Sequence, residues 1–167
     1  MDRVSELPHS IIAGWREWAS LPEIGVPWIK VKLDTGARTS ALHAFDVEEF
    51  EREGAEWVRF GVRPWQNSDE DAVVVETPVF DRRQVRSSSG HVEQRIVVLM
   101  RLVLLGRDVT AEVTLSNRDE MGFRMLVGRE ALRNGFLVAA GESFLGGRAP
   151  RPVRRQNRGR PDAPPTA

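Results

Sequence analysis

The chain has 167 residues, 41% hydrophobic and 29% charged, with a formal net charge of zero, values ordinary for one folded domain with a sizeable core. It contains no cysteine, which excludes disulfide bonds, thiolate nucleophiles and cysteine-ligated zinc. Its longest apolar run, residues 96–105, contains Arg101 and is far shorter than the roughly 20 residues that span a bilayer. The start of the chain lacks the pattern of a secretory signal, so we expect a cytoplasmic protein without a membrane segment.

The elements predicted in chain order are mostly short strands. Residues 11–20 and 26–33 flank the turn sequence LPEIG, which predicts a hairpin that ends at Asp34. Short helices are expected at residues 46–54 and 128–135, because each segment has helical periodicity and ends at a glycine. Further strands are expected at 56–62, 72–80, 92–105 and 109–115, with LLGRDV as the turn between the last two. The pattern predicts an all-β barrel or sandwich with one or two short helices.

The end of the chain has a different composition. Residues 147–167 carry six arginines against one aspartate, so the remainder has a net charge of about −5. The segment is rich in proline, glycine and arginine and has little to bury, which predicts a disordered basic tail over residues 146–167 after a folded domain over 1–145. Such a tail is either a solvated terminus or an arm that contacts RNA or another polyanion.

The sequence DTGARTS places Asp34 between an apolar strand and a turn of small residues. Burying an acid there is costly unless it is hydrogen-bonded or has a function. In such a turn threonine can lock the loop and glycine lets another backbone approach closely. Two loops of this kind would bring two carboxylates together, which then share one proton, so that one acts as base and the other as acid. Since the chain has a single Asp-Thr-Gly, this chemistry requires two chains around a two-fold axis.

A second pattern later in the chain strengthens this interpretation. MLVGREAL, residues 125–132, has two apolar residues followed by Gly-Arg and a helical segment, and it resembles the second signature of retroviral-type aspartic peptidases. Between the two patterns, residues 82–95 form a polar, glycine-containing turn, at the place where those peptidases carry the flap that closes over the substrate.

Several further motifs occur in the same order: GWREW, LPEIG, KLDTGARTSALHA, WVRF, RRQVRSSSG and MLVGREAL. Together they resemble the bacterial retropepsin-like family associated with the RimK glutamate ligase, a family also called ATP-dependent zinc proteases. The resemblance covers residues 14–137. It implies a closed retropepsin-like barrel active as a homodimer, which trims acidic, glutamate-rich tails added by a partner ATP-grasp ligase. The site residues implied are Asp34 as the catalytic carboxylate with Thr35 and Gly36, a flap at residues 82–90, and the structural pair Gly128 and Arg129.

One departure from the retroviral pattern affects the expected ion pairs. Retroviral enzymes have an acid two residues after the glycine of Asp-Thr-Gly, whereas this chain has Arg38. Arg129 therefore needs a different partner, and Glu130 is a candidate partner for Arg38.

Basic residues surround every segment expected to contact substrate. Arginine binds carboxylates bidentately and stays charged, so this distribution predicts an acidic substrate. The alternative is that the clusters reflect composition, since the only lysines are Lys30 and Lys32. The residues expected to contact substrate are Arg38, Arg82, Arg83, Arg86, Ser88, Ser89, Gly90 and His91, with Arg95, Arg124 and Arg129 nearby.

Two other functions remain open at this point. His9, His43 and His91 are widely separated and form no pattern typical of a metal site. We therefore expect no metal or other cofactor, although a zinc-dependent hydrolase using His43, His91 and Asp34 is an alternative. There is no phosphate-binding loop, so any dependence on ATP must come from a partner. The second alternative is a dimeric module that binds peptide for the ligase without cutting it.

Overall fold

The computed structural model describes residues 10–86, 89–117 and 122–160. Strands dominate it, and no helix among these residues is long and apolar enough to cross a membrane. In chain order the elements are β1 (Ile11–Leu21), η2 (Pro22–Ile24), β2 (Val26–Asp34), β3 (Ser40–His43), β4 (Phe45–Arg52), β5 (Ala55–Val62), β6 (Val73–Pro78), β7 (Asp81–Arg86), β8 (Val92–Leu104), β9 (Arg107–Ser116), β10 (Met125–Gly128), α1 (Arg129–Leu132), β11 (Phe136–Ser143) and α2 (Arg151–Asn157).

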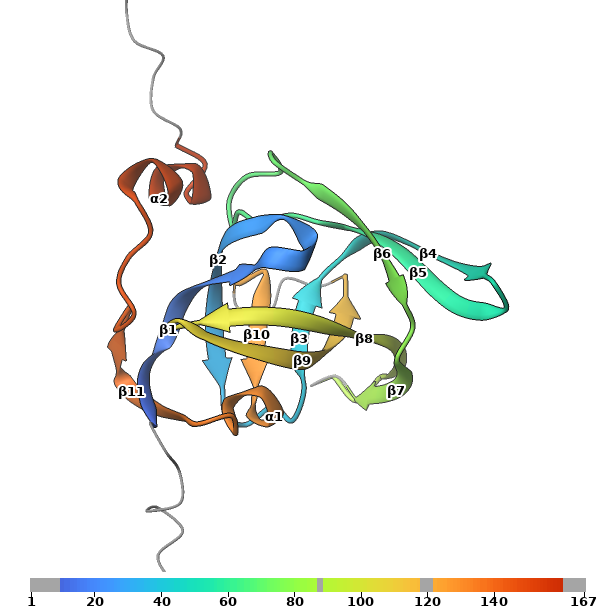
Figure 1. Ribbon diagram of the computed structural model, residues 1–167, viewed down its shortest axis with the longest axis horizontal. Coiled ribbons are helices and arrows are strands. Elements are labelled where there is room, and N and C mark those ends of the chain that lie inside the picture. Colours follow the sequence, from blue (N-terminus) through green and yellow to red (C-terminus); the bar gives the residue numbers. More distant parts are fainter. Residues whose placement is uncertain (1–9, 87–88, 118–121, 161–167) are drawn as a thin grey trace, which may run out of the picture.

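Eight strands form one sheet in the order β11-β1-β2-β10-β3-β9-β8-β7 (Figure 1). A further pairing of Ala19 with Leu104 and of Ser20 with Val103 joins β1 to β8 and closes six of these strands into a ring. Apolar side chains of these strands fill the interior. The predicted all-β barrel is therefore confirmed, and the strands predicted at 11–20, 26–33, 56–62, 72–80, 92–105 and 109–115 are all present.

The helix predicted at residues 46–54 is wrong, because this segment is strand β4 of a separate three-stranded sheet, β4-β5-β6. Glu53 and Gly54 both have positive φ, 52° and 79°. Two successive left-handed residues make the tight turn of a β-hairpin, and here they join β4 to β5. Pairing with β5 thus overrides the local helical preference, and Gly54 serves the hairpin turn instead of a helix end.

The second predicted helix is confirmed as α1, which is followed by Gly135 at a φ of 97°. The sequence did not predict β3 and β11. β3 has only four residues, too few for a recognisable pattern, and it exists because it lies between β9 and β10. β11 forms the sheet edge by pairing in parallel with the start of β1.

The prediction of a disordered tail from residue 146 is wrong for residues 146–160. Ala149 is buried, and α2 docks on the loop after β5 through the buried Asn157. The Asn157 side chain accepts a hydrogen bond from the Gln66 amide at 2.9 Å and donates one to Gln66 Oε1 at 2.8 Å. Its carbonyl accepts a bond from the Asn67 amide. These hydrogen bonds of Asn157 hold residues 146–160 in place although few apolar residues are available there. Residues 161–167 lie outside the described part of the chain.

Candidate active site

Asp34 lies at the end of β2, where a hydrophobic strand gives way to a turn. In β2 the side chains of Ile29, Val31 and Leu33 are buried, and the intervening ones point outward. Asp34 therefore continues the outer row of side chains and is partly exposed. In Figure 1 the ends of β2 and β10 and the helix α1 lie together along the lower edge of the barrel. Gly128 is the register partner of Asp34 in this parallel pair.

The turn after Asp34 is held by hydrogen bonds that backbone amides donate. The Gly36 amide donates to Asp34 Oδ1 at 3.1 Å, which orients the carboxylate. The Arg129 amide donates to the Ala37 carbonyl at 2.7 Å, and the Glu130 amide donates to the Arg38 carbonyl at 3.0 Å. The start of α1 thus fixes the loop that carries the carboxylate.

Gly128 makes this close approach possible. A Cβ atom at Gly128 would lie 2.5 Å from both the carbonyl carbon and the oxygen of Thr39. Its backbone is extended, at φ −89° and ψ 176°, so other residues could adopt this conformation and only space requires glycine. The expected structural role of Gly128 agrees with this geometry.

The hydrogen-bond partner of the Arg129 side chain is a backbone carbonyl, not a carboxylate. Its Nη1 donates to the Thr35 carbonyl at 3.2 Å, so the guanidinium braces the loop directly. Arg38, which replaces the acid of retroviral enzymes, faces Glu130 with 3.7 Å between Nε and Oε1. Both groups of that ion pair are exposed, so its contribution to stability is small.

Ser40 is a site residue that the sequence did not indicate. Its buried hydroxyl accepts a hydrogen bond from the Gly128 amide at 3.0 Å, and its carbonyl accepts one from Thr114 Oγ1 at 3.1 Å. Ser40 thereby connects the end of the loop to both β10 and β9. A small hydroxyl residue after a turn is too common to be recognised as a site residue without the fold.

The expected flap is the end of the β7–β8 hairpin. Arg86 pairs with Val92, so the turn spans residues 87–91. Ser87 and Ser88 lie outside the described residues. Ser89, Gly90 and His91 are exposed, and Gly90 has a φ of 86°. The hairpin is present, while its closing over a substrate stays a prediction.

Several of the basic residues expected to contact substrate pair with carboxylates of the chain itself. Arg82 contacts Glu49, and Arg83 bonds Glu112 through both terminal nitrogens at 3.2 and 3.3 Å. The Arg82 amide, and after it the Arg83 guanidinium, holds the pKa of Asp81 below its usual value.

Of the other arginines near the expected substrate contacts, Arg95 and Arg124 are buried, whereas Arg86 is exposed. Arg95 is buried and lies 3.6 Å from the carboxylate of Glu93. Arg124 is buried and donates to the Trp65 carbonyl at 2.8 Å. Arg86, on the strand that leads into the turn, is exposed.

The two histidines in the described part of the chain do not come together with Asp34 in a recognisable metal site. His43 is buried on β3, His91 is exposed at the flap turn, and His9 lies outside the described residues. Among residues 10–86, 89–117 and 122–160, no group of three or more histidine, aspartate or glutamate side chains is placed to hold a metal ion.

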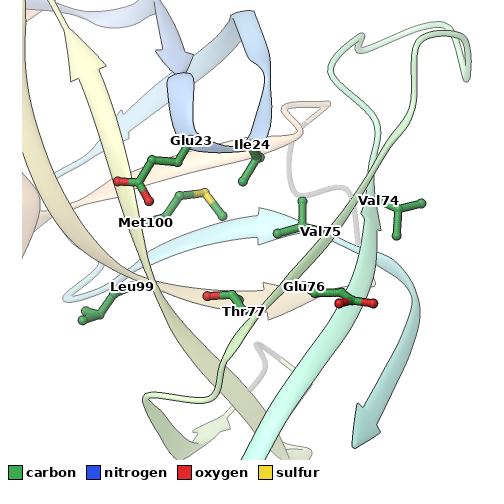
Figure 2. A pocket seen from close by; sticks show the side chains of 8 residues that line it. All are labelled: Glu23, Ile24, Val74, Val75, Glu76, Thr77, Leu99 and Met100. Atoms are coloured by element: carbon green, nitrogen blue, oxygen red, sulfur yellow. The ribbon is translucent and has the colours of Figure 1, made fainter. Parts of the chain in front are cut away.

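A hollow of about 260 Å³ lies elsewhere, between η2, β6 and β8 (Figure 2). Figure 2 shows the carboxylates of Glu23 and Glu76 at its opposite sides, with Met100 and Val75 between them. None of the predicted site residues lines it, so it is separate from the candidate active site.

Comparison with known proteins assigns the chain to a family. Residues 12–149 match the model of the RimB-like family, described as retropepsin-like aspartic endopeptidase RimB. The chain belongs to this family. The RimB-like match includes both the Asp-Thr-Gly turn and the Gly-Arg pair that braces it.

The chain is also similar to proteins named as ligases and to a solved structure of a protein of unknown function. The chain is 46% identical over 136 residues to a probable alpha-L-glutamate ligase of Shewanella halifaxensis, and 46% identical over 132 residues to one of Parasynechococcus marenigrum. These stretches cover 81% and 79% of this chain but only 30% and 28% of the relatives. A crystal structure of a Legionella pneumophila protein of unknown function has a TM-score of 0.71 and 27% identity, and covers 83% of this chain and 99% of its own.

Proposed function

We propose that this RimB-like protein is an aspartic peptidase in which Asp34 from two chains activates a water molecule. The observation that carries the proposal is the braced turn. A partly exposed carboxylate sits on a loop fixed by Gly36, Gly128 and Arg129, within a barrel of the retropepsin-like family. Such fixed positioning of a reactive group beside a solvent-accessible edge is what catalysis by water activation needs.

The proposed chemistry requires a homodimer with an isologous interface that brings the two Asp34 side chains together. One carboxylate, ionised, takes a proton from the water, and the resulting hydroxyl attacks the peptide carbonyl carbon. The other carboxyl group, protonated, polarises the carbonyl oxygen. Collapse of the tetrahedral intermediate breaks the carbon–nitrogen bond, and the nitrogen takes the proton that the first carboxylate removed from water, so that the amine leaves and both carboxyl groups return to their starting state. No metal or nucleotide takes part in this sequence.

The proposed substrate is a glutamate-rich peptide tail. This chain spans about 30% of the length of relatives named as probable glutamate ligases. Because those relatives carry a region similar to this chain, we propose that this protein and a separate glutamate ligase share a substrate or act as partners. Five described residues border the turn or the flap and are exposed, so they are proposed to contact the acidic chain: Arg38, Arg86, Ser89, Gly90 and His91. The proposed partner ligase would add glutamates at the expense of ATP, and this peptidase would remove them.

The test is hydrolysis of a glutamate-rich peptide by the wild type, Asp34→Asn and Asp46→Asn, followed by mass spectrometry. Asp46 is an exposed residue with a φ of 50°, a conformation that asparagine tolerates well, so this control removes an equal charge without strain. We expect Asp34→Asn to abolish hydrolysis and Asp46→Asn to leave it unchanged. Equal rates in all three proteins would refute the proposal, and peptide binding without any cleavage would favour the non-catalytic binding module.

Sedimentation of the protein with and without peptide tests the dimer. Full activity in a monomer would be incompatible with a carboxylate pair formed from two chains.

A further inference from the structure

A second cavity, of about 130 Å³, lies between the barrel and the C-terminal helix α2. Its walls come from β1, from β2, from the segment after β11 and from α2. They carry five cationic side chains and two aromatic ones. The lining residues are Arg16, Trp18, Lys30, Phe144, Arg148, Arg154, Asn157 and Arg158.

Among the described residues, no carboxylate lines this cavity. Its cations therefore differ from Arg82 and Arg83 of the flap, which pair with glutamates. Glu17 lies between two lining residues in the sequence, but its buried carboxylate accepts hydrogen bonds from the amides of Gly14, Leu145 and Gly146. Arg154 has a buried Nε atom with no hydrogen-bond partner in the described part of the chain. A buried donor of this kind is costly unless a ligand satisfies it.

The cations are crowded around one aromatic ring. The Arg16 guanidinium lies 5.0 Å from the centre of the Phe144 ring, and Lys30 Nζ and the Arg148 guanidinium each lie 5.5 Å from it. Burial, and after it the charges of Arg16, Arg158 and Arg148, lowers the pKa of Lys30. Cation–π contacts offset part of the repulsion, and a bound anion would offset more.

The cavity and Asp34 share one face of the sheet. Side chains alternate along β2, so Lys30, Lys32 and Asp34 lie on the same outer face. On the neighbouring strand β1, Trp18 pairs with Lys30 and Arg16 pairs with Lys32. Lys30 and Asp34 are four residues apart, which is about 13 Å along an extended strand. An extended peptide of about four residues would cover this distance.

We infer that this cavity is a carboxylate subsite that holds an acidic side chain of the glutamate-rich substrate, some four residues from the bond cleaved at Asp34. The inference rests on the proposed function. The cavity has room for a carboxylate, whereas pockets for drug-sized ligands are about 300 Å³ or larger. Arg154 and Arg158 lie beyond residues 12–149, which match the family model, so α2 supplies part of a specificity site that the family domain alone does not contain.

The experiment measures binding of fluorescently labelled octaglutamate by anisotropy, in Asp34→Asn protein so that cleavage does not interfere. Arg154→Ala/Arg158→Ala removes two lining cations. Arg151→Ala/Arg160→Ala is the matched control, since it removes two exposed cations of the same segment that do not line the cavity. We expect affinity to fall tenfold or more in the first variant and by less than about twofold in the control, because charge-assisted hydrogen bonds outweigh general attraction. Octaglutamine should bind neither protein appreciably.

The double substitution in α2 could release this helix from the barrel, which circular dichroism would report. A third variant, Arg148→Gln, lies outside α2 and keeps the test valid in that case. It should also weaken octaglutamate binding. Equal losses in the lining and control variants would overturn the inference, since the effect would then be general charge. Tighter binding of pyrophosphate or an RNA oligonucleotide through Arg154 and Arg158, with octaglutamate unaffected, would also overturn it and point to a phosphate site.

The proposed function is tested separately by cleavage with Asp34 intact. If cleavage does not depend on the lining arginines, the proposed subsite is wrong but the proposed peptidase activity stands. If the protein binds the peptide without cleaving it, the proposed peptidase activity is wrong.

Discussion

Gly128→Ala tests whether the close contact between β10 and the loop after Asp34 maintains the site. The new Cβ atom would lie 2.5 Å from the Thr39 carbonyl carbon and oxygen and 3.0 Å from the Arg38 oxygen. All three are backbone atoms, which cannot rotate away as the end of a side chain could. β10 and the loop must therefore separate by several tenths of an ångström.

The separation has a calculable cost. Overpacking of a tight interior contact costs about 1–3 kcal/mol. It also strains the bonds from the Arg129 amide to Ala37 and from the Gly128 amide to Ser40 Oγ, each worth about 0.5–1.5 kcal/mol. We expect a loss of about 2–4 kcal/mol in the free energy of unfolding. For a chain of this size that lowers the melting temperature by about 6–12 °C.

Thermal unfolding followed by circular dichroism measures this loss, and peptide cleavage well below the melting temperature measures the effect on the site. Gly141→Ala is the control. Gly141 lies on β11, and no atom outside its neighbours lies within 4 Å of a Cβ placed there. Its stability should be unchanged or higher by up to about 1 kcal/mol, because alanine restricts the unfolded chain. Wild-type stability and cleavage in Gly128→Ala would refute the role assigned to the contact.

Two further predictions concern the loop and the metal. Arg129→Ala removes the hydrogen bond to the Thr35 carbonyl, so we expect kcat/KM to fall about fivefold to tenfold with a melting temperature within a few degrees of wild type. The control Arg133→Ala removes an exposed partner of Glu130 and should change kcat/KM by less than about twofold. Equal kinetics in the two variants would contradict the bracing role of Arg129. Dialysis against EDTA should leave peptide cleavage intact, whereas loss of activity that zinc restores would show that the mechanism is metal-dependent.

Part of the site could be read from local sequence because its chemistry is local. The strand before Asp34, the Gly36 amide bonded to its carboxylate and the Gly-Arg pair that starts α1 all belong to short segments with recognisable patterns. The partner of Arg129 could not be read in this way. It is the carbonyl of Thr35, and a carbonyl is present at every residue, so only the fold selects one.

The same distinction explains the wrong predictions. Residues 46–54 have helical periodicity, yet strand pairing with β5 contributes hydrogen bonds and cross-strand contacts that outweigh this preference. Residues 146–160 have a composition typical of disorder, yet the segment is ordered by Asn157 bonding a loop that lies far away in the sequence.

The sequence by itself determined the alternation that builds the barrel, the family and the position of the candidate carboxylate, because strand periodicity and turn chemistry act over a few residues. Tertiary structure alone decided which cations are neutralised. Arg82 and Arg83 of the flap meet glutamates from other strands, whereas Arg16, Lys30 and Arg154 meet across the barrel and α2 with no carboxylate between them. Charge pairing depends on distances between distant segments, and the chain sets those distances only by folding.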